Sequence, residues 1–94
     1  MPYLIIEYEY DPPITDEQMV ANSMALDPCL QVRDVKRLRS WTSIDRKKGF
    51  CEFYAPDTET LREAYHTAQV KFSRVWPAML FEGAAPPDTW PGAS

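Results

Sequence analysis

The alternation of hydrophobic and polar side chains near the amino end predicts a β-strand over residues 3–10. Its side chains divide into two sets, with Tyr3, Ile5 and Glu7 on one face and Leu4, Ile6 and Tyr8 on the other. The alternation is only partial, because both sets are largely apolar. The run Asp11-Pro12-Pro13 is expected to end the strand, since proline cannot donate a backbone hydrogen bond.

A short amphipathic helix is predicted over residues 16–27. Thr15 and Gln18 have the spacing of a capping box, and the acidic residues Asp16 and Glu17 suit the positive end of a helix. The positions expected to share the buried face are Met19, Val20, Ser23 and Leu26. Pro28 is expected to end this helix.

The rest of the chain predicts two more strands, a second helix and a last strand. The strands are expected at residues 32–43 and 50–55, with residues 44–49 as the tip between them. Asp57 is the expected cap of the second helix, whose apolar positions at helical spacing are Leu61, Ala64, Tyr65 and Ala68. A last strand at about residues 74–82 contains Pro77, which favours an edge position in the sheet.

The resulting order, βαββαβ, is that of a ferredoxin-like α+β fold. This fold has a four-stranded antiparallel sheet with two helices on one face. We expect this domain to occupy residues 1–82. Residues 83–94 hold three prolines and two glycines and are expected to form a Pro/Gly-rich tail.

The second face of such a sheet has no helix to cover it. The side chains expected there are too apolar to remain in water, namely Ile5, Trp41, Phe50 or Phe53, and Trp76. We therefore predict a homodimer that closes sheet against sheet, a dimeric α/β barrel-like assembly.

Charge and composition narrow the class of partner. The chain of 94 residues carries a net charge of −4, which argues against nucleic-acid binding and against anionic membranes. No apolar run approaches the roughly 20 residues of a membrane span. Two cysteines, and no basic segment ahead of a long apolar stretch, lead us to expect a cytoplasmic protein with free thiols.

Several short motifs occur together in the second half of the chain. They are Ser40-Trp41, Cys51, Ala55-Pro56-Asp57, Arg62-Glu63-Ala64 and Arg74-Val75. In this order they resemble a family of small bacterial domains described as nickel-binding or nickel-responsive. The resemblance covers roughly residues 3–82, and it implies a ferredoxin-like subunit, a dimer and nickel as a ligand.

The candidate metal ligands are His66, Glu63 and Cys51. His66 and Glu63 are three residues apart on the helix face opposite the core, where a nitrogen and an oxygen can reach one cation. The same spacing also describes an ordinary solvated helix face. Cys51 is either a thiolate ligand or a buried thiol that packs as a small apolar side chain.

A second set of polar and aromatic residues on the strands forms a candidate ligand site or subunit interface: Glu7, Arg37, Arg39, Trp41 and Glu52. The sequence therefore predicts a small homodimeric binding protein for a metal or a small molecule. One alternative is a cofactor-free isomerase or oxygenase-like enzyme, with Glu7 or Glu52 as the base and its pocket between sheet and helices. Another is a protein-interaction module that presents residues 33–48, where seven of the ten basic residues lie.

Overall fold

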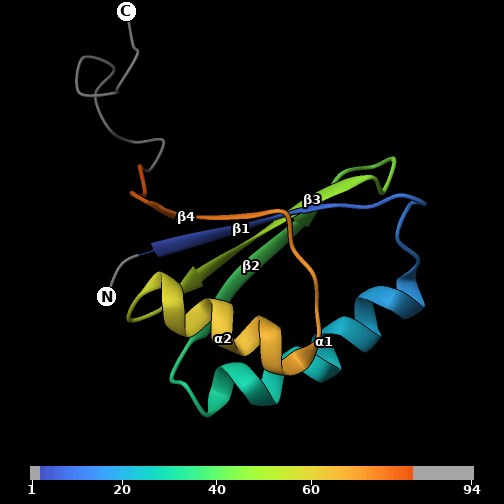
Figure 1. Ribbon diagram of the computed structural model, residues 1–94. Coiled ribbons are helices and arrows are strands. Elements are labelled where there is room, and N and C mark those ends of the chain that lie inside the picture. The colour runs from blue at the N-terminus through green and yellow to red at the C-terminus, as the bar shows by residue number, and fades with distance from the viewer. Residues whose placement is uncertain (1–2, 82–94) are drawn as a thin grey trace, which may run out of the picture.

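The computed structural model describes residues 3–81, which fold in the predicted order βαββαβ (Figure 1). The elements are β1 (Tyr3–Glu9), α1 (Asp16–Gln31), β2 (Lys36–Thr42), β3 (Lys48–Tyr54), α2 (Thr58–Ala68) and β4 (Arg74–Ala78). No helix among the described residues is both long enough and apolar enough to cross a bilayer. The predicted tail at residues 83–94, with Glu82, lies outside the described residues.

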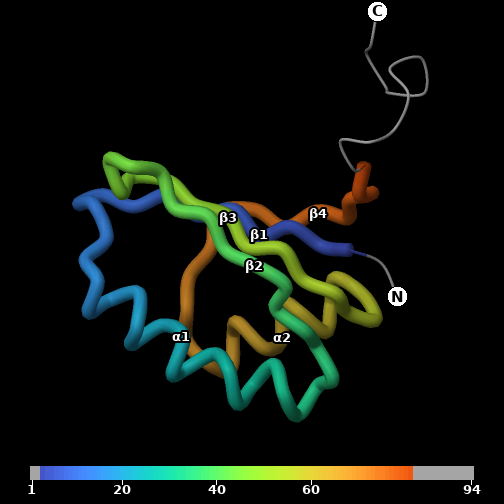
Figure 2. Tube along the Cα trace, turned by 180° about the vertical axis from the view of Figure 1, so that it is seen from behind, coloured from blue at the N-terminus to red at the C-terminus, as the bar shows by residue number. Residues whose placement is uncertain are grey.

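The four strands form one antiparallel sheet in the order β2-β3-β1-β4. Both helices lie on the same side of this sheet, which Figures 1 and 2 show from opposite directions. The predicted ferredoxin-like arrangement is therefore confirmed. Pro77 pairs with Leu4 on β1 and lies on edge strand β4, as its missing N–H requires.

The start of α1 follows the prediction and its end does not. Thr15 and Gln18 form the reciprocal capping box. The helix continues through Pro28 to Gln31, one turn beyond the expected end, because this last turn places Leu30 in the core at 4% exposure. The added turn also delays β2, which begins at Lys36 and not at residue 32.

The buried face of α1 follows the prediction only in part, since Met19 and Ser23 are half-buried. Leu26 is buried as expected, whereas Val20 is 59% exposed. Leu26 and Leu30 are four residues apart and lie on the same side of the helix. These two leucines attach α1 to the core.

Helix α2 begins and ends at identifiable caps. The Asp57 carboxylate accepts a hydrogen bond from the backbone N–H of Thr60 at 2.7 Å. Gln69 takes a left-handed conformation, with φ of 57°, and closes the helix. The predicted apolar face is confirmed, since Leu61, Ala64 and Tyr65 are each fully buried.

The core lies between the sheet and the two helices. It contains the predicted inward set of β1, which is Leu4, Ile6 and Tyr8, together with Phe53 and Ala55. Phe53 is fully buried, and Phe50, 40% exposed, lies on the other face of the sheet. The helix-covered face and the open face are therefore clearly distinct in this molecule.

Candidate functional site

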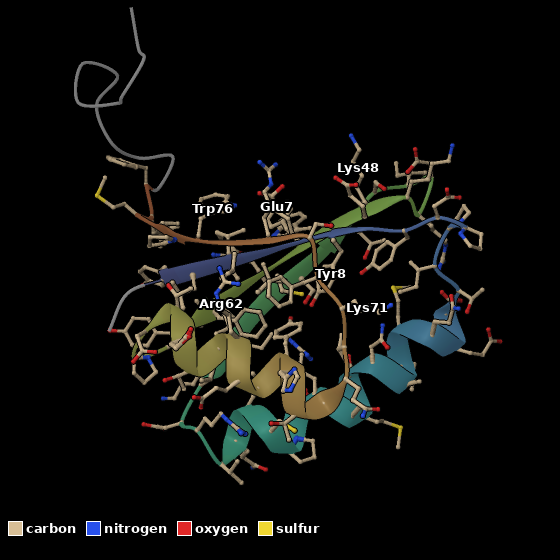
Figure 3. The ribbon with its side chains drawn as sticks, viewed as in Figure 1. Glu7, Tyr8, Lys48, Arg62, Lys71 and Trp76 are labelled. Carbon is tan, nitrogen blue, oxygen red and sulfur yellow. The ribbon has the colours of Figure 1, made fainter. Side chains whose placement is uncertain are left out.

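The open face of the sheet carries four of the five residues predicted as a ligand site or interface. Glu7, Arg39, Trp41 and Glu52 lie on this face, and Trp76 joins them from β4. Glu7 and Trp76 point away from the helices, whereas Tyr8 points between the sheet and the helices (Figure 3). Alternation along β1 thus separates two chemically different faces.

Two carboxylates on the open face each bind one arginine and one tryptophan. Glu7 accepts hydrogen bonds from the Trp76 indole at 2.5 Å and from the Arg74 guanidinium at 3.1 Å. On the other half of the sheet, Glu52 forms an ion pair with Arg39 and accepts a bond from the Trp41 indole at 3.4 Å. In each cluster the arginine is directly opposite the glutamate and the tryptophan is two residues further along the same strand.

Between these clusters the open face is apolar and hollowed. The Trp41 and Phe50 rings stack with their centroids 6.1 Å apart. A hollow of about 660 Å³ lies over β1 and β3, and its lining includes Ile5, Trp41, Phe50 and Trp76. The two glutamates and two arginines of the clusters balance in charge, so this face is aromatic and close to neutral.

Glu7 is held as a carboxylate by its partners. The hydrogen bond from Trp76, with the hydrogen bond and positive charge of Arg74, lowers the pKa of Glu7 below its ordinary value. A general base that acts near neutral pH needs a raised pKa. The geometry at Glu7 therefore favours an interface and gives no support to the enzymatic alternative at this residue.

The lowered pKa of Glu7 predicts an acid-dependent contribution to stability. A lowered folded-state pKa stabilises the fold above the unfolded-state value of about 4.5, and this stabilisation is lost as the pH falls through the folded-state pKa. The Glu7→Gln variant is expected to melt below the wild type at pH 6 and to approach it as the pH falls below the ordinary pKa of a glutamate. Thermal melts across this range check the result, and a gap that does not change with pH would contradict it.

Arg37 does not lie with the other four residues of its set. The pairing of β2 with β3 is interrupted between Arg37 and Arg39 by a β-bulge. Strict alternation would place these two arginines on one face, but the bulge turns Arg37 toward the helices. Its guanidinium binds Asp27 on α1 at 3.0 Å and lies over the ring of Phe53.

The basic segment over residues 33–48 is partly neutralised by other parts of the chain. Three of its arginines form ion pairs with acidic residues outside the segment, namely Arg37 with Asp27, Arg39 with Glu52 and Arg46 with Asp16. These pairs reduce the positive charge that the segment offers to an acidic partner. The interaction-module alternative therefore has less support than the charge count alone indicated.

The predicted metal ligands His66 and Glu63 lie on the exposed side of α2. They line a shallow hollow with Thr67 and two arginines, Arg33 and Arg62. Two guanidinium groups beside one carboxylate disfavour a cation. Helical spacing keeps His66 and Glu63 together, but the surroundings are poorly suited to a metal ion.

Cys51 lies on the other side of the core from that hollow. It is 7% exposed in β3, with its sulfur 2.9 Å from the Ser40 hydroxyl. Both cysteines are free thiols. Across residues 3–81, no group of three or more His, Cys, Asp and Glu side chains could hold a metal ion. The residues present in one described subunit therefore do not fit a nickel site.

An interior polar network was missed by the sequence interpretation. The hydroxyls of Tyr8 on β1 and Tyr65 on α2 are hydrogen-bonded to each other, and the Cys51 thiol donates to Tyr8 at 3.7 Å. Burial strongly raises the pKa of both phenols, so both stay protonated. A signal was available in the sequence, since two tyrosines at core-facing positions require hydrogen-bond partners inside the protein.

Comparison with known proteins shows the family of this chain. The model of the family described as "Nickel responsive protein SCO4226-like" matches residues 4–77. The chain belongs to this family. The family resemblance drawn from the sequence motifs is thereby confirmed.

The crystal structure of SCO4226 from Streptomyces coelicolor A3(2), a protein of this nickel-responsive family, is similar in fold. The TM-score is 0.75 at 15% sequence identity, and the match covers 85% of this chain and 99% of that chain. At this identity the likeness concerns the fold alone. No curated protein matches the chain.

Proposed function

We propose that this member of the nickel-responsive family is a small homodimeric binding protein whose subunits join through the open faces of their sheets. The observation that carries the proposal is the open face itself. Trp41, Phe50 and Trp76 are 54%, 40% and 43% exposed there, beside a hollow lined by the same three side chains. Exposed apolar surface of this extent marks an interaction site.

Charge supports a second copy of the chain as the occupant. The charged groups of the two clusters are already paired within one subunit, as Glu7 with Arg74 and Glu52 with Arg39. Burying paired charges avoids the large penalty for an unpaired buried ion. A strongly charged partner would find no complementary charge, whereas an identical neutral and aromatic face is complementary across a two-fold axis.

Sedimentation equilibrium of the tag-free full chain tests this assembly. We expect twice the mass of one subunit over a wide range of protein concentration. The fluorescence emission of the exposed tryptophans should shift to shorter wavelength as the dimer forms, because Trp41 and Trp76 lie on the joined faces. A folded protein that stays monomeric at high concentration would overturn the proposal.

The description of the family as nickel-responsive is the reason to propose that this protein binds nickel. His66 and Glu63 supply one nitrogen and one oxygen from α2, and further ligands must come from outside the described subunit. These two residues do not make a nickel site by themselves, so we propose only that His66 contributes one ligand to a weak site completed from outside the described residues. Cys51 is the least accessible of the three predicted ligands because it is buried in the core.

His66→Ala is expected to weaken nickel binding by more than about tenfold, since losing even a group that only orients a ligand costs that much. Cys51→Ser is expected to leave the binding unchanged. Calorimetric titration of tag-free protein with nickel measures both. Equal binding by wild type and His66→Ala would reject His66 as a ligand.

A further inference from the structure

A cavity of about 110 Å³ lies on the helix-covered side of the sheet, between α1 and β2. Its strand side includes Tyr8, Ser40 and Cys51, and its helix side includes Met19, Asn22 and Leu26. One water molecule needs only about 10–15 Å³ of such space. The cavity is therefore large enough for a small organic molecule.

Arg37 contributes an unpaired donor to this cavity. Its terminal nitrogen is used by Asp27 at 3.0 Å and lies 3.5 Å from the Ser23 hydroxyl. Its Nε is buried and has no hydrogen-bond partner, alone among such side-chain atoms in the described chain. A buried donor without an acceptor costs free energy, and native proteins rarely leave one unsatisfied.

The interior hydroxyl network holds one phenolic hydrogen that no acceptor within the network uses. The Cys51 thiol donates to Tyr8, so Ser40 is the donor in its contact with Cys51. Tyr8 and Tyr65 share a single contact, and only one of their two phenolic hydrogens is used in it. Either phenol can be the donor in that contact; we assign Tyr65 as the donor, because Tyr8 lines the cavity and its hydrogen can then reach a ligand there.

The chemistry of a ligand that would suit this cavity follows from these two donors. An N–H donor on a guanidinium and an O–H donor need two acceptor oxygens, and a carboxylate supplies both with charge assistance. The lining also includes the apolar side chains of Met19, Leu26 and Val70. We propose that this cavity binds a small carboxylate with a short apolar body, its oxygens on Arg37 Nε and the Tyr8 hydroxyl.

This site goes beyond the proposed dimer and does not depend on it. Arg37 and Tyr8 lie on the helix-covered side of the sheet, whereas the proposed subunit interface is the open face. A ligand can enter from the side of α1, because the lining residue Asn22 is half-exposed there. Failure of either proposal leaves the other intact.

Nuclear magnetic resonance of the full chain gives a direct test, because the Arg37 Nε–H signal reports on the proposed contact. The probes are isobutyrate and benzoate, with isobutyramide and benzamide as neutral counterparts. We expect a saturable shift of this signal with the carboxylates and at least about tenfold weaker binding of the amides. Equal binding of acid and amide, or no shift with either acid, would overturn the proposal.

Two substitutions in the cavity lining test where the carboxylate binds. Arg37→Lys keeps the charge but removes Nε–H, and Tyr8→Phe removes the hydroxyl, so each is expected to weaken carboxylate binding by about tenfold. Arg62→Lys is the matched control, since Arg62 is exposed on α2 and does not line this cavity. If Arg37→Lys fails to fold, Tyr8→Phe decides, and undiminished binding in a folded Tyr8→Phe protein would contradict the assignment.

Discussion

The Phe50→Lys variant is expected to sediment as a folded monomer at protein concentrations where the wild type is dimeric. Phe50 lies on β3, directly opposite Glu7 on β1, and it stacks on Trp41. In a monomer the new ammonium group is solvated and close to the Glu7 carboxylate. In a face-to-face dimer the substitution buries two additional unpaired cations, which costs far more than the association can supply.

Val32→Lys provides the matched control for this substitution. Val32 is 79% exposed at the end of α1, on the helical layer and away from the open face. Its replacement adds the same charge near the negative end of a helix and is expected to leave the mass unchanged. A Phe50→Lys protein that remains dimeric would place the subunit interface on another surface.

The fold could be predicted from the sequence because local signals and long-range packing agree along most of the chain. The capping box at Thr15, the cap at Asp57 and the two faces of β1 each formed as predicted. Pro28 is the exception. The helix continues past it, and the next turn buries Leu30 in the core.

The candidate site could be predicted only in part from the sequence, and Arg37 shows why. Alternation predicts that Arg37 and Arg39 share a face, so the two were grouped together. The bulge between them reverses this relation, and no glycine stands between them to signal it. Sequence reasoning thus gave the open-face members Glu7, Arg39, Trp41 and Glu52 and misplaced the one residue that points into the interior.

The interior network was missed for a different reason. Periodicity predicts that Tyr8 and Tyr65 are apolar positions of their elements, and their rings are indeed in the core. Their hydroxyls meet only in three dimensions, across 57 residues of sequence, and periodicity carries no information on such a contact. The same pair nonetheless connects β1 of the sheet to α2.

Tyr65→Ala is therefore expected to be among the most destabilising substitutions in the domain. The Tyr65 ring is fully buried and packs edge-on against Phe53 and Phe72, at centroid distances of 6.0 Å and 5.2 Å. Removing a buried aromatic ring costs about 3–5 kcal/mol, a large share of the roughly 5–15 kcal/mol that stabilises a whole domain. Thermal or urea unfolding should show a melting temperature lower by on the order of 20 °C.

Tyr65→Phe separates the ring from the hydroxyl. It keeps the packing against Phe53 and Phe72 and removes only the bond to Tyr8, so we expect a loss of about 0.5–1.5 kcal/mol. Because the Tyr8 hydrogen already faces the cavity in the proposed arrangement, Tyr65→Phe should bind the carboxylate probes as the wild type does. If the two substitutions destabilise the protein equally, the hydroxyl contact and not aromatic packing joins α2 to the sheet, contrary to the assignment made from burial.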